Sequence, residues 1–165
     1  MQIRLILAVC ALSAVTGATT CPNGFSAPET GGKAPDFSLK DLKGAEVKLS
    51  DLKGKVVLLS FSATWCPHCR TAVPKLKEIE ARYKDRDFVL LSIFIEESGK
   101  KVSSFAAKYD IAYRILLDED GAVAKAYGVR GIPSKTLVGK DGVIVCRDCR
   151  DVEPELAKLL GGAGK

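Results

Sequence analysis

The chain has 165 residues, about the size of one domain, with 47% apolar and 27% charged residues. This composition excludes a disordered chain, a collagen-like repeat and a protein with several membrane spans. Lys and Arg exceed Asp and Glu by 25 to 20, giving a net charge of +5. The basic residues are scattered rather than gathered in a stripe with aromatic residues, so the charge does not indicate a nucleic-acid partner.

Residues 1–18 have the order of a secretory signal peptide. Arg4 provides a positive charge, an apolar run follows, and small residues precede the expected cleavage near Ala18. The apolar run of about 11 residues is short for a membrane span, and a retained N-terminal membrane anchor is the alternative. We therefore expect a periplasmic or otherwise extracytoplasmic protein, in a compartment where disulfides form and persist. Residues 19–34 are rich in Gly, Pro, Ser and Thr, which predicts a flexible tether.

The third part of the chain, residues 35–165, alternates apolar runs with helical periodicities. Nearly continuous apolar runs predict buried strands over residues 56–62 and 88–95. Segments that flank turns predict strands over residues 36–39 and 45–49 and over residues 134–138 and 143–146. Apolar residues three or four positions apart predict helices over residues 71–84, 99–109, 122–127 and 151–160. Buried strands that alternate with helices predict one α/β domain with a mixed sheet and helices on both faces.

The segment Trp65-Cys66-Pro67-His68-Cys69 lies between the strand over 56–62 and the helix that follows it. A helix N-terminus has free N–H groups and a partial positive charge, and both favour the thiolate form of a cysteine. Cys66 is therefore the expected nucleophile. Cys69 lies one turn further along on the same side, where it is placed to attack a mixed disulfide at Cys66.

Two other uses of this cysteine pair are weaker. A structural bridge between Cys66 and Cys69 closes a loop of about four residues, which constrains the unfolded chain by only about 2 kcal/mol. A zinc site would need a second pair nearby, but Cys69 and Cys146 are separated by far more than the roughly 15 to 20 residues typical of zinc ribbons. We therefore favour thiol–disulfide chemistry and expect neither a metal nor another cofactor.

His68 and Trp65 are the only residues of their types in the chain, and both adjoin the cysteines. An imidazole beside Cys66 stabilises the thiolate, and stabilising the reduced form makes the disulfide more oxidising. Trp65 and Pro67 are expected to form an apolar rim on which a partner protein docks. Simple packing is the alternative for Trp65.

Residues 61–69 resemble the active-site stretch of the thioredoxin-like superfamily, and residues 127–134 resemble the loop that holds its cis-proline. Residues 34–39 and 49–55 resemble the N-terminal hairpin of the TlpA/ResA-like extracytoplasmic branch. The resemblance covers residues 33–160. It implies a thioredoxin-like fold, with a central mixed β-sheet flanked by helices and an N-terminal β-hairpin extension.

The resemblance also implies roles for individual residues. Cys66 would be the attacking thiol, Cys69 the resolving thiol, and Pro133 would follow a cis peptide bond that faces them; an ordinary trans proline is the alternative. The backbone of Ile132 would pair with an extended substrate segment. The implied function is an exported thiol–disulfide oxidoreductase for protein cysteines, in cytochrome c or metal-site maturation, served by a membrane or periplasmic redox partner.

Two positions depart from the family pattern. Ser60 stands where thioredoxins carry a buried aspartate, and Ala72 stands where ResA-like proteins carry a glutamate. Both acids help to deprotonate the resolving thiol, so Glu96 or Glu97, at the end of a buried strand, is the candidate replacement. The dipeptide between the cysteines resembles that of strongly oxidising DsbA-like proteins, whereas the TlpA/ResA branch consists mostly of reductants. The sequence therefore leaves the direction of electron flow open.

We expect the oxidoreductase to be a monomer. Two other functions remain as alternatives to it. A peroxidase of the related peroxiredoxin group needs a threonine three residues before its reactive cysteine, where this chain has Ala63. A metal carrier would use Cys66, Cys69, Cys146 and Cys149 as its ligands.

Cys146 and Cys149 have no match in the family pattern, and their pairing with each other or with Cys21 is open. In a fully extended chain their Cα atoms would be about 10 Å apart, whereas a disulfide allows at most about 7 Å. A bridge between them therefore needs a turn at Arg147-Asp148, and Asp is a common turn residue. Our hypothesis is that this turn exists, and that the pair is a second redox couple that exchanges with the first pair.

Overall fold

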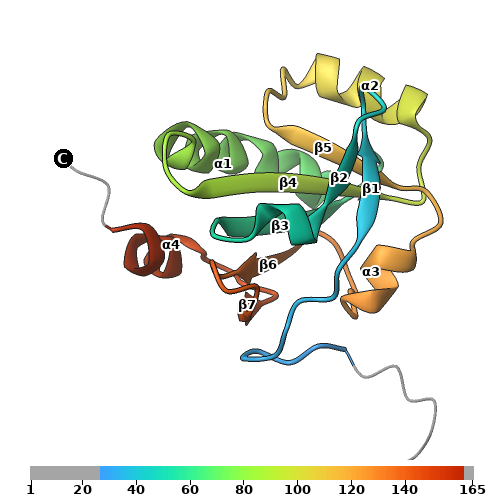
Figure 1. The fold of residues 1–165 in the computed structure, drawn as a ribbon. Coiled ribbons are helices and arrows are strands. Elements are labelled where there is room, and N and C mark those ends of the chain that lie inside the picture. The colour runs from blue at the N-terminus through green and yellow to red at the C-terminus, as the bar shows by residue number, and fades with distance from the viewer. Residues whose placement is uncertain (1–26, 162–165) are drawn as a thin grey trace, which may run out of the picture.

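The computed structural model describes residues 27–161, which form a mixed sheet with helices on both faces (Figure 1). The strands are β1 (Ser38–Asp41), β2 (Glu46–Lys48), β3 (Val56–Ser62), β4 (Phe88–Ile95), β5 (Arg114–Asp118), β6 (Ser134–Val138) and β7 (Ile144–Arg147). Their order in the sheet is β2-β1-β5-β4-β3-β6-β7. Strands β3, β4 and β5 are parallel, and the other neighbours are antiparallel. The predicted signal peptide and Cys21 lie outside the described residues.

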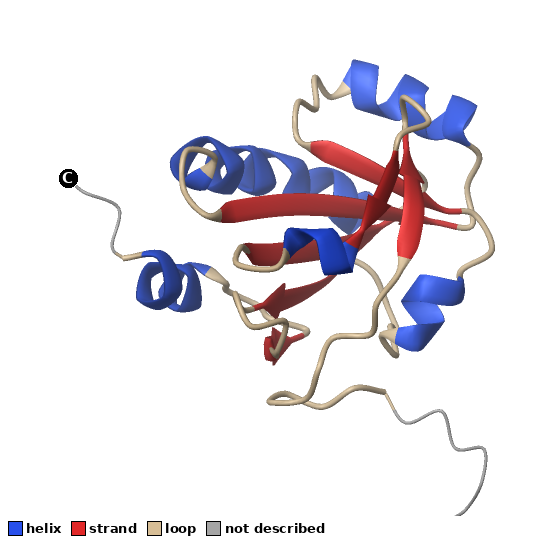
Figure 2. Ribbon diagram, in the orientation of Figure 1, coloured by secondary structure: helices blue, strands red, loops and turns tan. Residues whose placement is uncertain are grey.

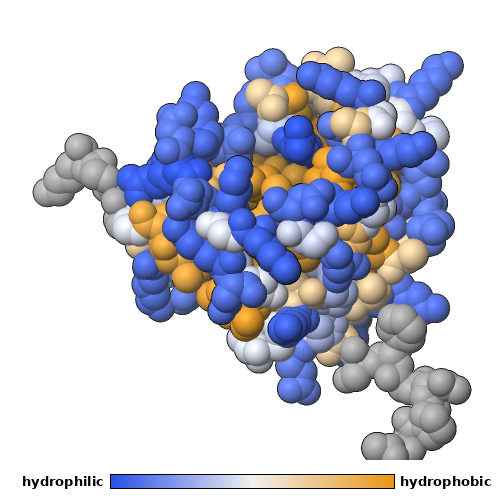
Figure 3. Space-filling model, viewed as in Figure 1, coloured by the Kyte–Doolittle hydropathy of each residue, from blue (hydrophilic) through white to orange (hydrophobic). Residues whose placement is uncertain are grey.

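Four α-helices and one short 3-10 helix cover this sheet (Figure 2). They are η1 (Leu49–Leu52), α1 (Pro67–Tyr83), α2 (Gly99–Lys108), α3 (Ala122–Ala126) and α4 (Glu153–Leu160). Within residues 27–161, none of them has the length and apolar character needed to cross a membrane. On the face seen in Figure 3, hydrophilic side chains surround smaller groups of apolar ones, in agreement with the scattered charge of the sequence.

Alternate residues of β3 divide the core into two layers. Val56 and Leu58 pack with buried residues of α1, α2 and α4 on one face of the sheet. Val57, Leu59 and Phe61 pack on the other face with residues of α3 and the N-terminal hairpin. A central parallel strand covered on both faces needs apolar side chains at nearly every position, which is why this run was predictable from the sequence.

Helix α1 begins inside the cysteine motif rather than at residue 71, so the predicted start was wrong. Cys66 is its N-cap residue, and Pro67 occupies the first helical position, where its fixed φ is suitable and its missing N–H costs nothing. Pro74 lies inside the helix, which continues to Tyr83. The buried stripe of α1 has the predicted helical spacing: Val73, Leu76, Ile79 and Tyr83.

Two elements, η1 and β5, were not predicted. The charged Arg114 interrupts the apolar pattern at the start of β5, and the strand is defined by its parallel pairing with β4, from Leu91↔Arg114 to Ile95↔Asp118. The first strand of the hairpin was predicted two residues too early, because β1 runs from Ser38 to Asp41, whereas the second was predicted one residue too long at each end. The carboxylate of Asp41 accepts hydrogen bonds from the backbone N–H groups of Lys43 and Ala45 and so closes the turn.

The last residues of the predicted tether lie along the outer edge of β7. The N–H of Gly31 donates to the Ile144 carbonyl at 2.8 Å, and the N–H of Ile144 donates to the Gly32 carbonyl at 2.9 Å. Lys33 continues this contact as a bridge to Val143. The prediction of a flexible tether over 19–34 was therefore wrong at its C-terminal end, because these residues satisfy the free backbone groups of an edge strand.

Candidate functional site

Cys66 lies where β3 ends and α1 begins, at the carboxyl edge of the parallel strands. Its sulfur accepts a hydrogen bond from the backbone N–H of Cys69 at 3.2 Å. Its S–H donates to the carbonyl of Ile132, with 3.7 Å between the sulfur and the oxygen. The helix N-terminus therefore places an N–H group directly on this sulfur, as expected for a site that stabilises negative charge.

Cys69 is the more deeply buried sulfur of the pair, and both thiols are free. Burial, together with the hydrogen bond to Cys66, raises the pKa of Cys69 to about 11, although the Ser62 hydroxyl and the Ala63 N–H act in the opposite direction. Cys69 therefore stays protonated at neutral pH in this state. This is the behaviour expected of a resolving thiol before it is activated.

The loop before β6 covers the two sulfurs from the other side. The Ile132–Pro133 peptide bond is cis, and Ile132 packs against Ala63, Cys66 and Cys69. Ser134, which follows the proline, pairs with Phe61 near the end of β3. The antiparallel pairing of β6 with β3 thus brings a loop distant in sequence onto the cysteine motif.

Trp65, Pro67 and His68 are exposed around the sulfurs. The side chain of Trp65 is 62% exposed, the one large hydrophobic residue so exposed among those described. Trp65 and Ile132 line a cleft of about 560 Å³ that continues past Ile95 to Lys125 of α3. The sequence-predicted residues Cys66, Cys69, Trp65, Ile132 and Pro133 therefore meet at one surface, with a cleft of mixed apolar and charged lining beside it.

Glu97, just beyond the end of β4, is buried behind the cysteine motif. Its carboxylate accepts hydrogen bonds from the N–H and the hydroxyl of Thr64, both at 2.6 Å, and forms an ion pair with Lys101. Burial opposes its ionisation, but the hydrogen bonds from Lys101 and Thr64 outweigh that effect and hold the pKa of Glu97 below its ordinary value. The exposed Glu96, by contrast, lines the cleft.

Arg70 holds the same loop from the opposite direction. Its guanidinium donates two hydrogen bonds to the carbonyl of Thr64, at 3.1 and 3.0 Å. Thr64 is therefore fixed at its N–H, hydroxyl and carbonyl, immediately before Trp65 and Cys66. Sequence reasoning missed Thr64 and Arg70. It offered Glu96 or Glu97 as the acid that acts on Cys69, whereas the structure places the carboxylate of Glu97 on Thr64, in the loop that carries Cys66.

The second cysteine pair forms a disulfide, with Cys146 and Cys149 Cα atoms 5.9 Å apart. The turn that this bridge requires is present, and Asp148 has a φ of 48°. Among residues 27–161, no group of three or more His, Cys, Asp or Glu side chains lies close enough to hold a metal ion. The described structure thus does not bring the four cysteines together as a metal carrier would require.

Comparison with known proteins identifies the family of this fold and site. A model of the AhpC/TSA family matches residues 30–159. The chain belongs to the AhpC/TSA family. It is 34% identical over 137 residues to the thiol-disulfide oxidoreductase ResA of Bacillus cereus, a match that covers 81% of this chain and 79% of the relative.

Solved structures give the same picture. The chain is similar to the thioredoxin domain of a thiol-disulfide oxidoreductase from Bacteroides vulgatus, with a TM-score of 0.75, 27% identity and coverage of 82% of this chain and 100% of that one. It is also similar to a secreted disulfide oxidoreductase of Mycobacterium tuberculosis, with a TM-score of 0.60, 28% identity and coverage of 66% and 79%.

These relatives and the fold establish the type of reaction that the protein catalyses. The protein is a ResA-like thiol–disulfide oxidoreductase of the thioredoxin superfamily, and its substrates are proteins that contain cysteines. The peroxidase alternative required a hydroxyl three residues before the reactive cysteine. Ala63, which occupies that position, is buried beside Cys66 and offers none.

Proposed function

We propose that Cys66 and Cys69 form the redox centre of an exported oxidoreductase. The observation that carries this proposal is the placement of Cys66: its sulfur caps α1 and faces the carbonyl of Ile132, just before the cis bond to Pro133. The backbone N–H of Cys69 stabilises the attacking sulfur, while the opposite loop offers a backbone edge for a substrate.

The reaction proceeds in two exchanges. The Cys66 thiolate attacks one sulfur of a substrate disulfide, the substrate S–S bond breaks, and one substrate thiolate leaves and takes up a proton. The thiolate of Cys69 then attacks Cys66, forming the Cys66–Cys69 disulfide and releasing the second substrate thiol. Two electrons pass from the enzyme to the substrate, and the reverse sequence oxidises a substrate dithiol.

An extended substrate segment lies along the cleft beside the motif. The exposed ring of Trp65 and the neighbouring Pro67 form one apolar rim, and the backbone of Ile132 pairs with the segment. Because main-chain groups recognise any sequence, this arrangement suits an enzyme that acts on several proteins.

His68 sits on the first turn of α1, exposed between the two cysteines of the sequence. A histidine there stabilises the thiolate of Cys66 and so raises the reduction potential. In His68→Pro the potential should fall by more than about 10 mV, a third of a tenfold change in the equilibrium constant. An unchanged potential would make His68 incidental.

Residues 1–18 direct export, and the mature protein acts as a monomer in the periplasm or another extracytoplasmic compartment. The order of charged, apolar and small residues supports this location, as does the secreted relative from Mycobacterium tuberculosis. Its substrates are cysteine-containing proteins in cytochrome c or metal-site maturation, and a membrane or periplasmic protein exchanges electrons with it.

A glutathione titration monitored by Trp65 fluorescence tests the redox centre. Trp65 adjoins Cys66, and the chain contains no other tryptophan to dilute the signal. The wild type should show one two-electron transition, which is lost in Cys66→Ser. A potential near that of thioredoxin, about −270 mV, assigns a reductant, and one near that of DsbA, about −120 mV, assigns an oxidant. A transition that survives in Cys66→Ser would contradict the proposal.

A further inference from the structure

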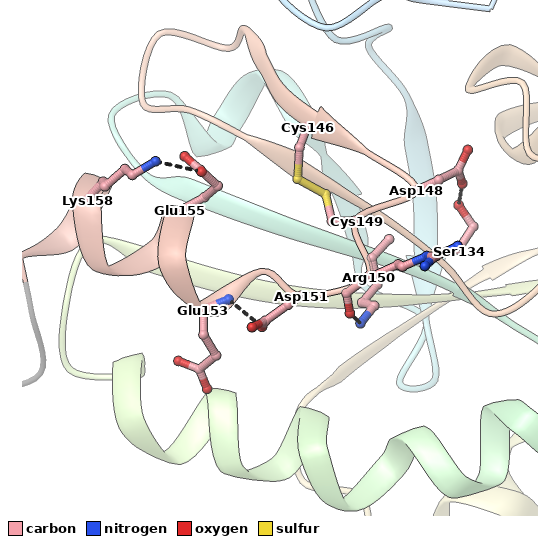
Figure 4. The surroundings of a disulfide bond; sticks show 10 residues. Ser134, Cys146, Asp148, Cys149, Arg150, Asp151, Glu153, Glu155 and Lys158 are labelled. Atoms are coloured by element: carbon pink, nitrogen blue, oxygen red, sulfur yellow. Dashed lines mark hydrogen bonds and ion pairs between the residues drawn. A yellow bond between two sulfur atoms is a disulfide. The ribbon is translucent and has the colours of Figure 1, made fainter.

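The Cys146–Cys149 bridge lies at the end of β7, the outermost strand on its side of the sheet. It joins cysteines only three positions apart in the sequence, across a turn in which Asp148 has a positive φ. Figure 4 shows the carboxylate of Asp148 pointing away from the disulfide, toward Ser134. The pair thus has the Cys-x-x-Cys spacing of the first redox centre, but in a strand-to-turn setting rather than at a helix N-terminus.

Bonds that do not involve sulfur hold this turn in shape. The Ser134 hydroxyl donates to Asp148 at 2.6 Å, and the backbone N–H of Cys149 donates to the Lys135 carbonyl at 3.1 Å. The Lys135 ammonium donates in turn to the carbonyl of Arg150. Because these hydrogen bonds fix the backbone of the turn, the disulfide can open while the turn keeps its shape.

A purely structural role matches this bridge poorly. The constraint that a disulfide places on the unfolded chain grows with the loop it closes, and this loop is about the shortest possible. Strand β7, which carries Cys146, is already paired with β6, where Leu137 lies opposite Cys146. Beyond the turn, Val152 and Leu156 anchor the start of α4 in the core, with 1% and 0% exposure.

The two cysteines differ in exposure. Cys149 is buried against the core layer that contains α1 and α4, whereas Cys146 is half-buried at the rim of the same layer. An incoming thiolate therefore reaches Cys146 first, and Cys149 is the leaving sulfur. A disulfide that is opened by an incoming thiolate needs one accessible sulfur to be attacked, and its other sulfur can be buried because it only leaves.

The two cysteine pairs contact neighbouring parts of the chain. The sulfur of Cys66 meets the carbonyl of Ile132, and the N–H of Cys149 donates to the carbonyl of Lys135, the second residue of β6. The exchange between the two pairs that the sequence suggested stays a prediction. A second molecule that carries its own dithiol can instead reach the bridge from the side of the half-buried Cys146.

We propose that Cys146–Cys149 is a second redox-active centre, reduced by a protein dithiol of the Cys-x-x-Cys class. A thiolate of the donor attacks the Cys146 sulfur, the Cys146–Cys149 bond breaks, and Cys149 leaves as a thiolate and takes up a proton. The second donor thiol then attacks its own partner in the mixed disulfide and releases Cys146 as a thiol. Two electrons have moved, the donor is a disulfide, and Cys146 and Cys149 are both reduced.

The test uses oxidised Cys66→Ala/Cys69→Ala protein, in which the first pair is absent, so that failure here leaves the first centre unaffected. One arm adds reduced Cys146→Ala/Cys149→Ala protein, whose one remaining Cys-x-x-Cys pair is Cys66 and Cys69, and this arm reports a second copy as donor. The other arm adds reduced thioredoxin, which reports a separate donor. Acid quenching, alkylation and peptide mapping then measure the freed thiols.

In at least one arm, Cys146 and Cys149 should open at least about tenfold faster than with glutathione at equal thiol concentration, because a dithiol resolves its own mixed disulfide. With a thioredoxin that lacks its resolving cysteine, the trapped bond should be to Cys146. A bridge that stays closed in both arms, or a trapped bond at Cys149, overturns the proposal. Loss of the native circular dichroism spectrum in Cys146→Ala/Cys149→Ala would also overturn it, because the turn would then depend on the bridge.

Discussion

The two Cys-x-x-Cys segments have the same spacing but lie in different local structures. Cys66 caps α1, and the N–H of Cys69 donates to its sulfur. Cys146 and Cys149 instead span a turn at the end of an edge strand, where the N–H of Cys149 donates to a carbonyl of β6. In the first segment, the backbone N–H of the second cysteine donates to a sulfur. In the second segment, the corresponding N–H donates to a carbonyl of the neighbouring strand.

This difference shows that spacing alone does not determine what a cysteine pair does. The first pair has a donor on its attacking sulfur, a cleft beside it and the loop of Pro133 across from it. The second has none of these contacts among the described residues, but its turn is held independently of the bridge by Asp148. We therefore expect the first pair to react with substrates and the second to respond to a specific donor.

The largest expected effect separates the two pairs by activity. Cys66→Ser should lower the rate of insulin disulfide reduction by about 1000-fold or more, because the only attacking thiolate is lost. Cys146→Ala/Cys149→Ala should lower it by less than about tenfold, since electrons enter the substrate through Cys66. Equal losses in a turbidity assay would contradict the distinction between the segments.

The second effect concerns the hydrogen bonds between Glu97 and Thr64, which hold the loop before Cys66 and have no counterpart at the second pair. Glu97→Ala should lower the free energy of unfolding by about 3 kcal/mol, because two buried donors of Thr64 lose their charged acceptor. Urea denaturation at neutral pH measures this, with the exposed Glu119→Ala expected to cost less than about 0.5 kcal/mol. A similar loss of unfolding free energy in both variants would mean that the hydrogen bonds between Glu97 and Thr64 do not hold the loop.

The same carboxylate gives a pH dependence of known sign. The pKa of Glu97 lies below its ordinary value of 4.5, so its stabilisation is complete above that pH and is lost as the pH falls further. The stability difference between wild type and Glu97→Gln should therefore shrink as the solution is acidified below pH 4.5. A difference that does not change with pH would show that the charge of Glu97 contributes nothing.

A smaller effect is expected on stability at the second pair. Cys146→Ala/Cys149→Ala should reduce the free energy of unfolding by no more than about 2 kcal/mol, because so short a loop constrains the unfolded chain little. Calorimetry of the oxidised proteins provides the comparison. A much larger loss would assign the bridge a structural role and remove the contrast between the two segments.

The smallest expected effect is the change of the first pair's reduction potential with pH. Each proton bound during a two-electron reduction lowers the potential by about 30 mV per pH unit. Because the pKa of Cys69 is raised to about 11, this thiol binds a proton throughout the range from neutral pH to about pH 10. The slope should stay at or above about 30 mV per unit there, and a flat profile above pH 9 would contradict the protonated state of Cys69.

The sequence predicted those parts of the fold that depend on local pattern. Strands β3, β4 and β6 were placed to the residue. Strands β3 and β4 are nearly continuous apolar runs, and β6 lies directly before the turn at residues 139–142. Strand β5 was missed because its pairing with β4 defines it, and the start of α1 was missed because a capping cysteine is not a typical N-cap residue.

The site was predictable where chemistry is concentrated in one motif, and not where it depends on tertiary contacts. Cys66, Cys69 and Pro133 were identified from spacing and resemblance. The contact of Glu97 with Thr64 follows from the parallel alignment of β3 and β4, which no single segment reveals. Arg70 acts on a backbone carbonyl, and an arginine near the start of a helix gives no signal of that partner.

Trapping the substrate intermediate tests the central claim most directly. In the Cys69→Ala variant the resolving thiol is absent, so a mixed disulfide with a disulfide-bonded substrate protein should accumulate. Peptide mapping by mass spectrometry is expected to find the substrate cysteine bonded to Cys66. A substrate bonded to Cys146 or Cys149, or no mixed disulfide at all, would contradict the assignment of Cys66 as the attacking thiol.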